Sequence, residues 1–137
     1  MSASLSIIVY KGSPVDAPDL RHTALFLDFP GSNSLLLHIV GTSGIFQPQV
    51  KQNEDPSKSQ KFVRKIAVAK IQGRTRNDLQ SRIMATPIKN SDKSWNCQHW
   101  IGDALVRLSN PGWISSSARE AAVDTMADVV TDAPDES

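Results

Sequence analysis

Cys97 is the residue of this sequence best suited to covalent chemistry, and it is the only cysteine in the chain. It stands at the start of a segment with helical spacing of apolar residues, and either Ser94 or Asn96 can cap that helix. In the first turn of a helix, unpaired backbone N–H groups and the helix dipole favour a thiolate and lower the pKa of a thiol. This position suits a cysteine nucleophile, although a buried structural cysteine can occupy the same place.

A cysteine nucleophile needs a base within hydrogen-bond reach, and the chain has three histidines. His99 follows the cysteine by two residues, so on a helix its side chain points to a different face. His22 lies near the start of the apolar segment 20–29, and His38 lies near the end of the apolar segment 33–40. These two histidines are the candidates for the base and for a residue that orients it. Each can equally be an ordinary core or edge residue.

The segments that carry the two histidines are predicted to pair as a β-hairpin, because Pro30-Gly31-Ser32 breaks the chain between them. If residues 30–32 form the loop, Ala24 faces His38. His22 then lies diagonally across from His38 on the same face, about 7–8 Å away by general strand geometry. A shift of the register by one residue would put the two histidines on opposite faces of the sheet.

The remaining elements follow from hydrophobic periodicity, capping residues and turn residues. Strands are predicted over residues 4–11, 20–29, 33–40 and 61–71, and residues 51–60 are predicted to form a polar loop. Helices are predicted over residues 76–85, from the cap at 94 or 96 to about 109, and over 116–130. This order predicts an α+β fold in which an antiparallel β-sheet packs against helices. The single domain is expected to span residues 1–130, followed by an acidic, disordered tail over residues 131–137.

The segments around the cysteine and the two histidines resemble those of two known families. Residues 96–100 (Asn-Cys-Gln-His-Trp) resemble the Asn-Cys-Glu-His-Phe helix of the lecithin:retinol acyltransferase family and the Asn-Cys-Asn-His-Phe helix of the PPPDE deSUMOylating peptidases. Residues 22–28 are similar to the His-Trp-Ala-Ile-Tyr-Val-Gly strand of the acyltransferase family, and residues 36–39 to its Val-Ile-His-Leu. Both families are permuted papain-like proteins, related to the NlpC group, in which the histidine precedes the cysteine, as it does here.

The resemblance implies a permuted papain-like fold and a role for each matched residue. Cys97 would be the nucleophile, His22 the base that activates it, and His38 the residue that orients the His22 imidazole. The thiol would attack an amide, ester or thioester carbonyl, and amide groups at the helix N-terminus would stabilise the oxyanion. The other residues around the nucleophile are expected to contact the substrate or to support the catalytic side chains; they are Trp95, Asn96, Gln98, His99 and Trp100.

The composition is that of an ordinary globular protein, with 39% hydrophobic and 21% charged residues. The formal net charge of +1 gives no overall field that would attract nucleic acid or an anionic membrane. No stretch approaches the roughly 20 apolar residues of a membrane span. One cysteine cannot form an intrachain disulfide or a thiolate zinc site, and the histidines lack ligand spacing. We therefore expect a cytoplasmic protein without a metal, a cofactor, a nucleic-acid partner or a membrane span.

Two further segments leave alternatives open. Basic residues are frequent between positions 58 and 76, where they form either a solvated strand face or a dock for an acidic partner or a phosphate-bearing substrate. The apolar positions of segment 116–130 either pack on the domain or form a subunit contact, so the sequence leaves the oligomeric state open. The acyltransferase family usually adds a membrane-anchoring helix, and residues 116–137 are too polar to be one. A soluble substrate is therefore favoured over a lipid drawn from a bilayer.

The expected function is that of a thiol hydrolase, such as a thiol protease, or an acyltransferase, acting on a small acyl or amide compound or on a peptide. No residue decides between water and another acceptor for the acyl group. The first alternative is a binding module that keeps the papain-like fold without turnover, in which Cys97 is unreactive. The second is a structural protein in which Cys97 is a core residue only.

Overall fold

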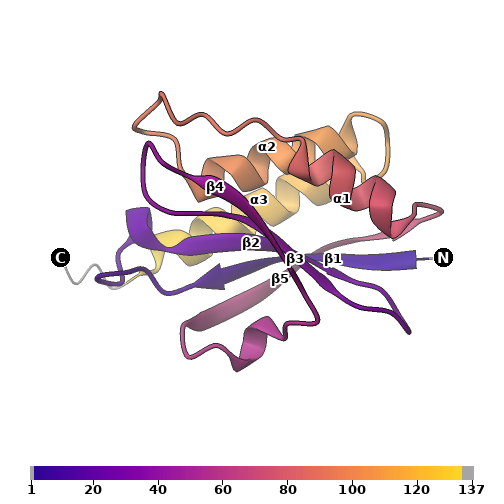
Figure 1. Cartoon of the computed structure of the whole chain (residues 1–137), viewed down its shortest axis with the longest axis horizontal. Coiled ribbons are helices and arrows are strands. Elements are labelled where there is room, and N and C mark those ends of the chain that lie inside the picture. Colours follow the sequence, from indigo (N-terminus) through magenta and orange to yellow (C-terminus); the bar gives the residue numbers. More distant parts are fainter. Residues whose placement is uncertain (1, 134–137) are drawn as a thin grey trace.

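In a computed structural model, residues 2–133 are described, and they contain five β-strands and three α-helices (Figure 1). The strands are β1 (Ser2–Tyr10), β2 (His22–Asp28), β3 (Leu35–Val40), β4 (Gln47–Gln52) and β5 (Phe62–Gln72). The helices are α1 (Arg76–Met84), α2 (Cys97–Ser109) and α3 (Ser116–Thr131). Short 3-10 helices lie at Pro18–Leu20 and Pro56–Lys58.

The strands form one antiparallel sheet in the order β4-β3-β2-β1-β5, and the helices pack against it. Figure 1 shows the three helices on the same side of the sheet. The chain is therefore a single α+β domain, as the order of strands and helices predicts. None of the helices within residues 2–133 is both long enough and apolar enough to cross a membrane.

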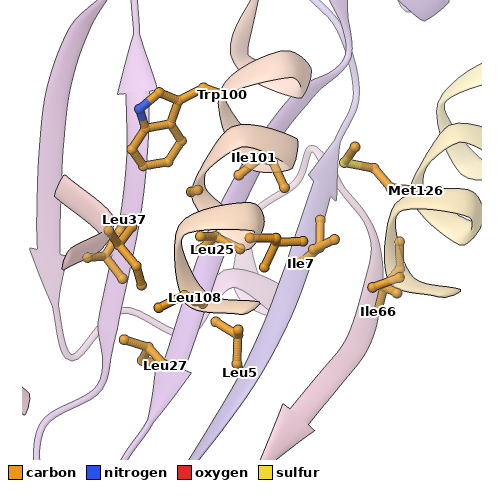
Figure 2. Close-up of a cluster of buried hydrophobic side chains, with 14 of the residues drawn as sticks. Leu5, Ile7, Leu25, Leu27, Leu37, Ile66, Trp100, Ile101, Leu108 and Met126 are labelled. Carbon is orange, nitrogen blue, oxygen red and sulfur yellow. The ribbon is translucent and has the colours of Figure 1, made fainter. Parts of the chain in front are cut away.

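The two faces of the sheet bury separate apolar clusters, because successive side chains of a strand point to opposite faces. The larger cluster lies between the sheet and the helices, where residues such as Ile7, Leu25 and Leu37 contact α2 and α3 (Figure 2). The smaller cluster contains no helix residue and consists of Ile8, Tyr10, Ala24, Phe26 and Leu36, with Phe62 packed against it. The inner strands β1, β2 and β3 are therefore apolar on both faces.

Helix α2 is the centre of the larger cluster, and its sequence explains why it forms where it does. Asn96 is the N-cap, since its side chain accepts hydrogen bonds from the backbone N–H groups of Gln98 and His99. The predicted apolar stripe is buried as expected, and its members are Cys97, Trp100, Ile101, Ala104, Leu105 and Leu108. Burial of each large side chain of this stripe contributes about 1.5–3 kcal/mol and fixes which face of the helix meets the sheet.

Most predicted elements are observed with ends shifted by one or two residues, and three differences bear on the site or on the tail. Residues 51–60 were expected to be a loop, but β4 extends through Gln52 and a 3-10 turn follows. Strand β2 begins at His22 rather than at residue 20, because residues 18–20 form the other 3-10 turn. Helix α3 continues through Thr131, the first residue of the predicted tail. Residues 134–137 of that predicted tail lie outside the described residues.

Candidate active site

The hairpin of β2 and β3 brings His22 and His38 together. The observed ladder pairs Leu25 with Leu37, Phe26 with Leu36 and Leu27 with Leu35, which is the register predicted from the loop at residues 30–32. Beyond the last pair, the two histidines meet through their side chains, with His22 Nε2 2.7 Å from His38 Nδ1. The predicted diagonal arrangement on one face is therefore confirmed.

A third side chain, Gln49 of β4, continues this arrangement. Gln49 lies opposite His38 in the β3–β4 ladder, and its Oε1 lies 2.7 Å from His38 Nε2. Because an amide oxygen only accepts hydrogen bonds, His38 must carry its proton on Nε2. The Nδ1 of neutral His38 then accepts the Nε2–H of His22. This relay of hydrogen bonds leaves the lone pair of neutral His22 on Nδ1, free to accept a proton.

Both histidines are held in the neutral form. Burial, with smaller effects from the charges of His38 and Lys51, lowers the pKa of His22 to about 4. Burial also lowers the pKa of His38, and the hydrogen bond with Gln49 opposes that effect. The ring of Tyr10 stacks on His22 with ring centroids 5.6 Å apart. At neutral pH, His22 can therefore accept a proton, but the imidazolium it forms is costly in this environment.

Cys97 lies in the first turn of α2, as predicted, but its thiol does not have the expected low pKa. Burial raises the pKa of the Cys97 thiol, and this effect exceeds the lowering by the N–H groups of Thr23, Cys97 and Gln98 and by the Thr23 hydroxyl. The Sγ atom lies 3.7 Å from the carbonyl oxygen of Arg21, in the geometry of an S–H donor. The expectation of a thiolate was wrong. It rested on the N–H groups of the helix N-terminus, which lower the thiol pKa, and did not include the burial of the thiol where α2 packs on β2, which raises it.

Cys97, His22 and His38 line one open cavity of about 1200 Å³. Cys97 belongs to the cluster on the helix side of the sheet, whereas His22 lies on the opposite face, which it shares with Ala24 two residues along β2. The cavity joins the two sides where β2 begins. A hydrogen bond joins His22 to His38. Within the described residues, neither histidine forms a hydrogen bond with Cys97, whose thiol is directed at the Arg21 carbonyl. The thiol and its candidate base therefore share a cavity without a resting hydrogen bond.

The Arg21 carbonyl that receives the thiol is held by a buried network. The Arg21 guanidinium forms an ion pair with Asp16 at 3.0 Å and donates a hydrogen bond to the Val129 carbonyl at 2.7 Å. The side-chain amide of Gln98 donates to the carbonyls of Pro18 and Arg21, at 2.9 and 3.2 Å. These contacts fix the N-terminus of α2 against the start of β2, so the network sets where the sulfur lies relative to the cavity.

The other predicted site residues have different positions. Asn96 caps α2, and His99, which is exposed, accepts the Asn96 N–H on Nδ1 to complete a capping box. Trp95 is buried, lines the cavity and packs edge-on against Phe46. Trp100 is 1% exposed and lies in the core, with its ring N–H directed at the Thr86 carbonyl, so it does not line the cavity. Of the two roles expected for Trp100, substrate contact or support of the catalytic side chains, its buried position in the apolar stripe favours the second.

Sequence reasoning missed three residues of the site, which are Gln49, Tyr10 and Thr23. Gln49 sits in an exposed strand without apolar alternation, although its separation of eleven residues from His38 fits a second hairpin. Tyr10 pairs with His22 across β1 and β2, which follows only from the strand order. Within residues 2–133, no three side chains of the His, Cys, Asp and Glu types lie close enough together to hold a metal ion.

Residues 7–115 match the model of a protein family described as a family of unknown function, DUF6540. The chain belongs to this family. The DUF6540 region contains the whole hydrogen-bond relay and Cys97, whereas α3 follows it. No curated protein and no solved structure matches the chain. The permuted papain-like assignment made from the motifs therefore stays a prediction.

Proposed function

We propose that this DUF6540 protein is a thiol hydrolase or acyltransferase in which Cys97 attacks an amide, ester or thioester carbonyl and His22 accepts the thiol proton. The observation that carries the proposal is the relay from Gln49 through His38 to His22. It leaves the His22 lone pair on Nδ1, in the same cavity as the only cysteine of the chain. A nucleophile, a base and a group that orients the base are the parts that covalent acyl transfer requires.

In the proposed first step, the Cys97 side chain turns from the Arg21 carbonyl into the cavity. Its sulfur forms a bond to the substrate carbonyl carbon while the thiol proton moves to His22 Nδ1, and the carbonyl π electrons move onto oxygen. The tetrahedral adduct then collapses, and the leaving amine, alcohol or thiol takes the proton from His22. A thioester on Cys97 results. His22, again neutral, activates water or another acceptor to release the acyl group.

The residues around Cys97 and His22 affect the two charges that form in this step, the positive charge on His22 and the negative charge on the substrate oxygen. The His22 imidazolium would keep its Nε2–H directed at His38 Nδ1, so the relay holds the ring in place during proton transfer. Asn96 engages the N–H groups of Gln98 and His99, and leaves the Cys97 N–H at the start of α2 as a donor for the oxyanion. The raised thiol pKa and the lowered His22 pKa disfavour a resting ion pair. Proton transfer therefore accompanies C–S bond formation.

A second candidate function is a binding module without turnover, and the resting state of the thiol favours it. The Cys97 S–H points to the Arg21 carbonyl, and burial raises the thiol pKa, as in a structural cysteine. In that case the cavity would hold a ligand without covalent chemistry. The two candidates differ in whether Cys97 can form an acyl adduct.

The test uses p-nitrophenyl acetate, a generic activated ester, with intact-protein mass spectrometry and nitrophenolate release. We expect one acetyl group on Cys97 in the wild type, none at that position in Cys97→Ala, and much slower acetylation in His22→Ala. Peptide mapping separates Cys97 from lysine acetylation, and far-UV circular dichroism confirms that each variant is folded. If folded wild-type protein neither gains an acetyl group on Cys97 nor releases nitrophenolate faster than Cys97→Ala, the catalytic proposal fails and the binding module takes its place.

A further inference from the structure

The cavity has a basic end next to His22. The whole cavity is lined by five lysines, which are Lys11, Lys51, Lys58, Lys61 and Lys93. The carboxylates that line it are those of Glu54 and Asp55. The backbone N–H of Lys11 donates to the Lys61 carbonyl at 2.7 Å, so these two residues are adjacent in space. Lys58 ends the 3-10 turn that precedes Lys61. We call the set of Lys11, Lys58 and Lys61 the lysine cluster.

The lysine cluster is adjacent to the proposed base through Tyr10. Tyr10 immediately precedes Lys11, pairs with His22 in the sheet and stacks on its ring at 5.6 Å between centroids. On its other side, Tyr10 pairs with Phe62, the residue after Lys61. The lysine cluster therefore lies at the ends of β1 and β5, next to the end of β2 that carries His22, and it opens into the same cavity.

The carboxylates nearby are already engaged. Lys51 forms an ion pair with Glu54 at 3.6 Å. Asp55 accepts hydrogen bonds from the backbone and side chain of Ser57 and keeps its negative charge, which interacts with Lys58 and offsets part of the charge of the lysine cluster. Asp16, which lies near Lys11, forms the buried ion pair with Arg21. None of the ion pairs found in residues 2–133 includes a member of the lysine cluster. The basic end of the cavity is therefore short of negative charge.

We propose that the lysine cluster binds an anionic group of the acyl substrate, a carboxylate or a phosphate, while the carbonyl to be attacked lies at Cys97. The inference rests on the proposed function for the position of the carbonyl, and on the unpaired cluster for the charge of the substrate. A concave site lined by one sign of charge concentrates ligands of the opposite sign and speeds their association. Three ammonium groups on flexible side chains suit an anion whose shape varies.

The first test compares two maleimides that differ by a carboxylate, 3-maleimidopropionate and N-ethylmaleimide, as alkylating agents of Cys97. The ratio of their second-order rate constants is measured for the folded protein and for the urea-unfolded chain, in which the lysines are dispersed. We expect the folded protein to favour the anionic reagent several-fold over the unfolded chain, and 1 M salt to remove most of that preference. Equal ratios in the folded and unfolded chains contradict the proposal.

The variants for this test remove equal charge at two places. Lys58→Gln/Lys61→Gln removes two members of the cluster, and Arg64→Gln/Lys70→Gln removes two charges from exposed positions of β5 that do not line the cavity. The first double variant should lose the preference for the anionic reagent, and the second should keep it. An equal loss in both variants would mean that net charge, rather than the lysine cluster, causes the preference, and would overturn the proposal.

A second measurement does not depend on a reactive thiol, so it separates this proposal from the proposed function. Glutarate and inorganic phosphate are titrated into the Cys97→Ala protein while the backbone amides of Lys11, Lys58 and Lys61 are followed by NMR. We expect saturable shifts at these amides with at least one anion, and their absence in Lys58→Gln/Lys61→Gln. The anion that binds more tightly identifies carboxylate or phosphate as the recognised group. If neither anion shifts these amides in a saturable manner, the lysine cluster is not an anion site.

Discussion

His22 and His38 are joined by a hydrogen bond of 2.7 Å, and Gln49 fixes its direction from the far side of His38. The three side chains come from β2, β3 and β4, so two successive hairpins build the relay. Since His38 is 5% exposed, its ring has little access to water other than through Gln49 and the cavity. The position of one side-chain amide thus determines which nitrogen of His22 can accept a proton.

Replacing Gln49 by Glu should raise the pKa of His38 and of His22, because a carboxylate beside the relay stabilises the imidazolium form. Since Gln49 is exposed and water screens the added charge, the rise of both pKa values should be modest. Ring ¹⁵N chemical shifts of both histidines against pH measure it. Gln47→Glu adds the same charge to the same strand and face without the contact, and should move the titrations much less. Equal changes of the two histidine pKa values in both variants would contradict the role assigned to the contact between Gln49 and His38.

The same ring shifts test the tautomers directly. In the wild type at pH 7, His22 and His38 should both carry their proton on Nε2, leaving Nδ1 of His22 unprotonated. Gln49→Ala should mix the tautomers, because water can both donate to and accept from His38 Nε2. A wild-type spectrum with the His22 proton on Nδ1 would mean that the relay runs in the opposite direction and that His22 cannot serve as the base.

The depressed pKa of His22 should make the protein less stable in mild acid. The folded-state pKa of about 4 lies below the ordinary value of 6.5, so below pH 6.5 the unfolded chain binds the proton that the folded protein excludes. Stability from this group is therefore present above pH 6.5 and falls as the pH decreases toward 4. Between pH 7 and pH 5 the loss should be about 2 kcal/mol.

Urea unfolding at pH 7, 6 and 5 measures this loss in the wild type and in His22→Gln, which cannot titrate. The loss should be markedly smaller in the variant over the same interval. Asp16, whose pKa is lowered to about 2 by the hydrogen bond and charge of Arg21, loses its contribution only below about pH 4, outside this window. If the stability of the wild type and of the variant depends on pH in the same way, the pKa of His22 is not lowered in the folded protein.

The ion pair of Arg21 and Asp16 should be among the most sensitive contacts of the fold. Their side chains are 7% and 9% exposed, so Arg21→Met would remove the guanidinium charge from a largely buried carboxylate. We expect a loss of about 3–5 kcal/mol in the free energy of unfolding, by chemical denaturation. Glu120→Gln breaks an ion pair whose acidic side chain is 68% exposed and should change stability by less than about 1 kcal/mol. Similar losses in the two variants would contradict the assigned burial.

Thr23→Val should raise the thiol pKa of Cys97 further without destabilising the protein. The Thr23 hydroxyl is buried, acts on the Cys97 thiol as a hydrogen-bonding group that helps to lower that pKa, and has no other hydrogen-bond partner in the described chain. Replacing it with a methyl group of similar size therefore removes a buried polar group at little or no cost. The matched control is Thr86→Val, which removes another buried hydroxyl without a partner. Above about pH 8, where the thiolate itself reacts, the pH dependence of Cys97 alkylation should change in the first variant only, and an unchanged profile there would contradict the assignment.

The hairpin register and the buried face of α2 were predictable because local features specify them. The break at residues 30–32 fixes the loop, and the spacing from Cys97 to Leu108 fixes the helix face. Strand β4 was not predictable, because an edge strand that is exposed along most of its length carries no apolar alternation and tolerates Pro48. The thiol pKa depends on the packing of α2 against β2, which joins residues more than 70 positions apart. Burial at such a contact cannot be derived from a helix cap alone.

The pH dependence of Cys97 alkylation by iodoacetamide shows whether neutral His22 activates the neutral thiol. In the wild type, the rate should be nearly independent of pH between about 5 and 7, because His22 can accept a proton throughout that range, and should fall near its pKa of about 4. In His22→Ala, the rate should be far lower at pH 6 and fall about tenfold per pH unit, since only the thiolate reacts. If both proteins lose about tenfold per pH unit below the thiol pKa, at equal rates, His22 is not the base and the account of the site is wrong.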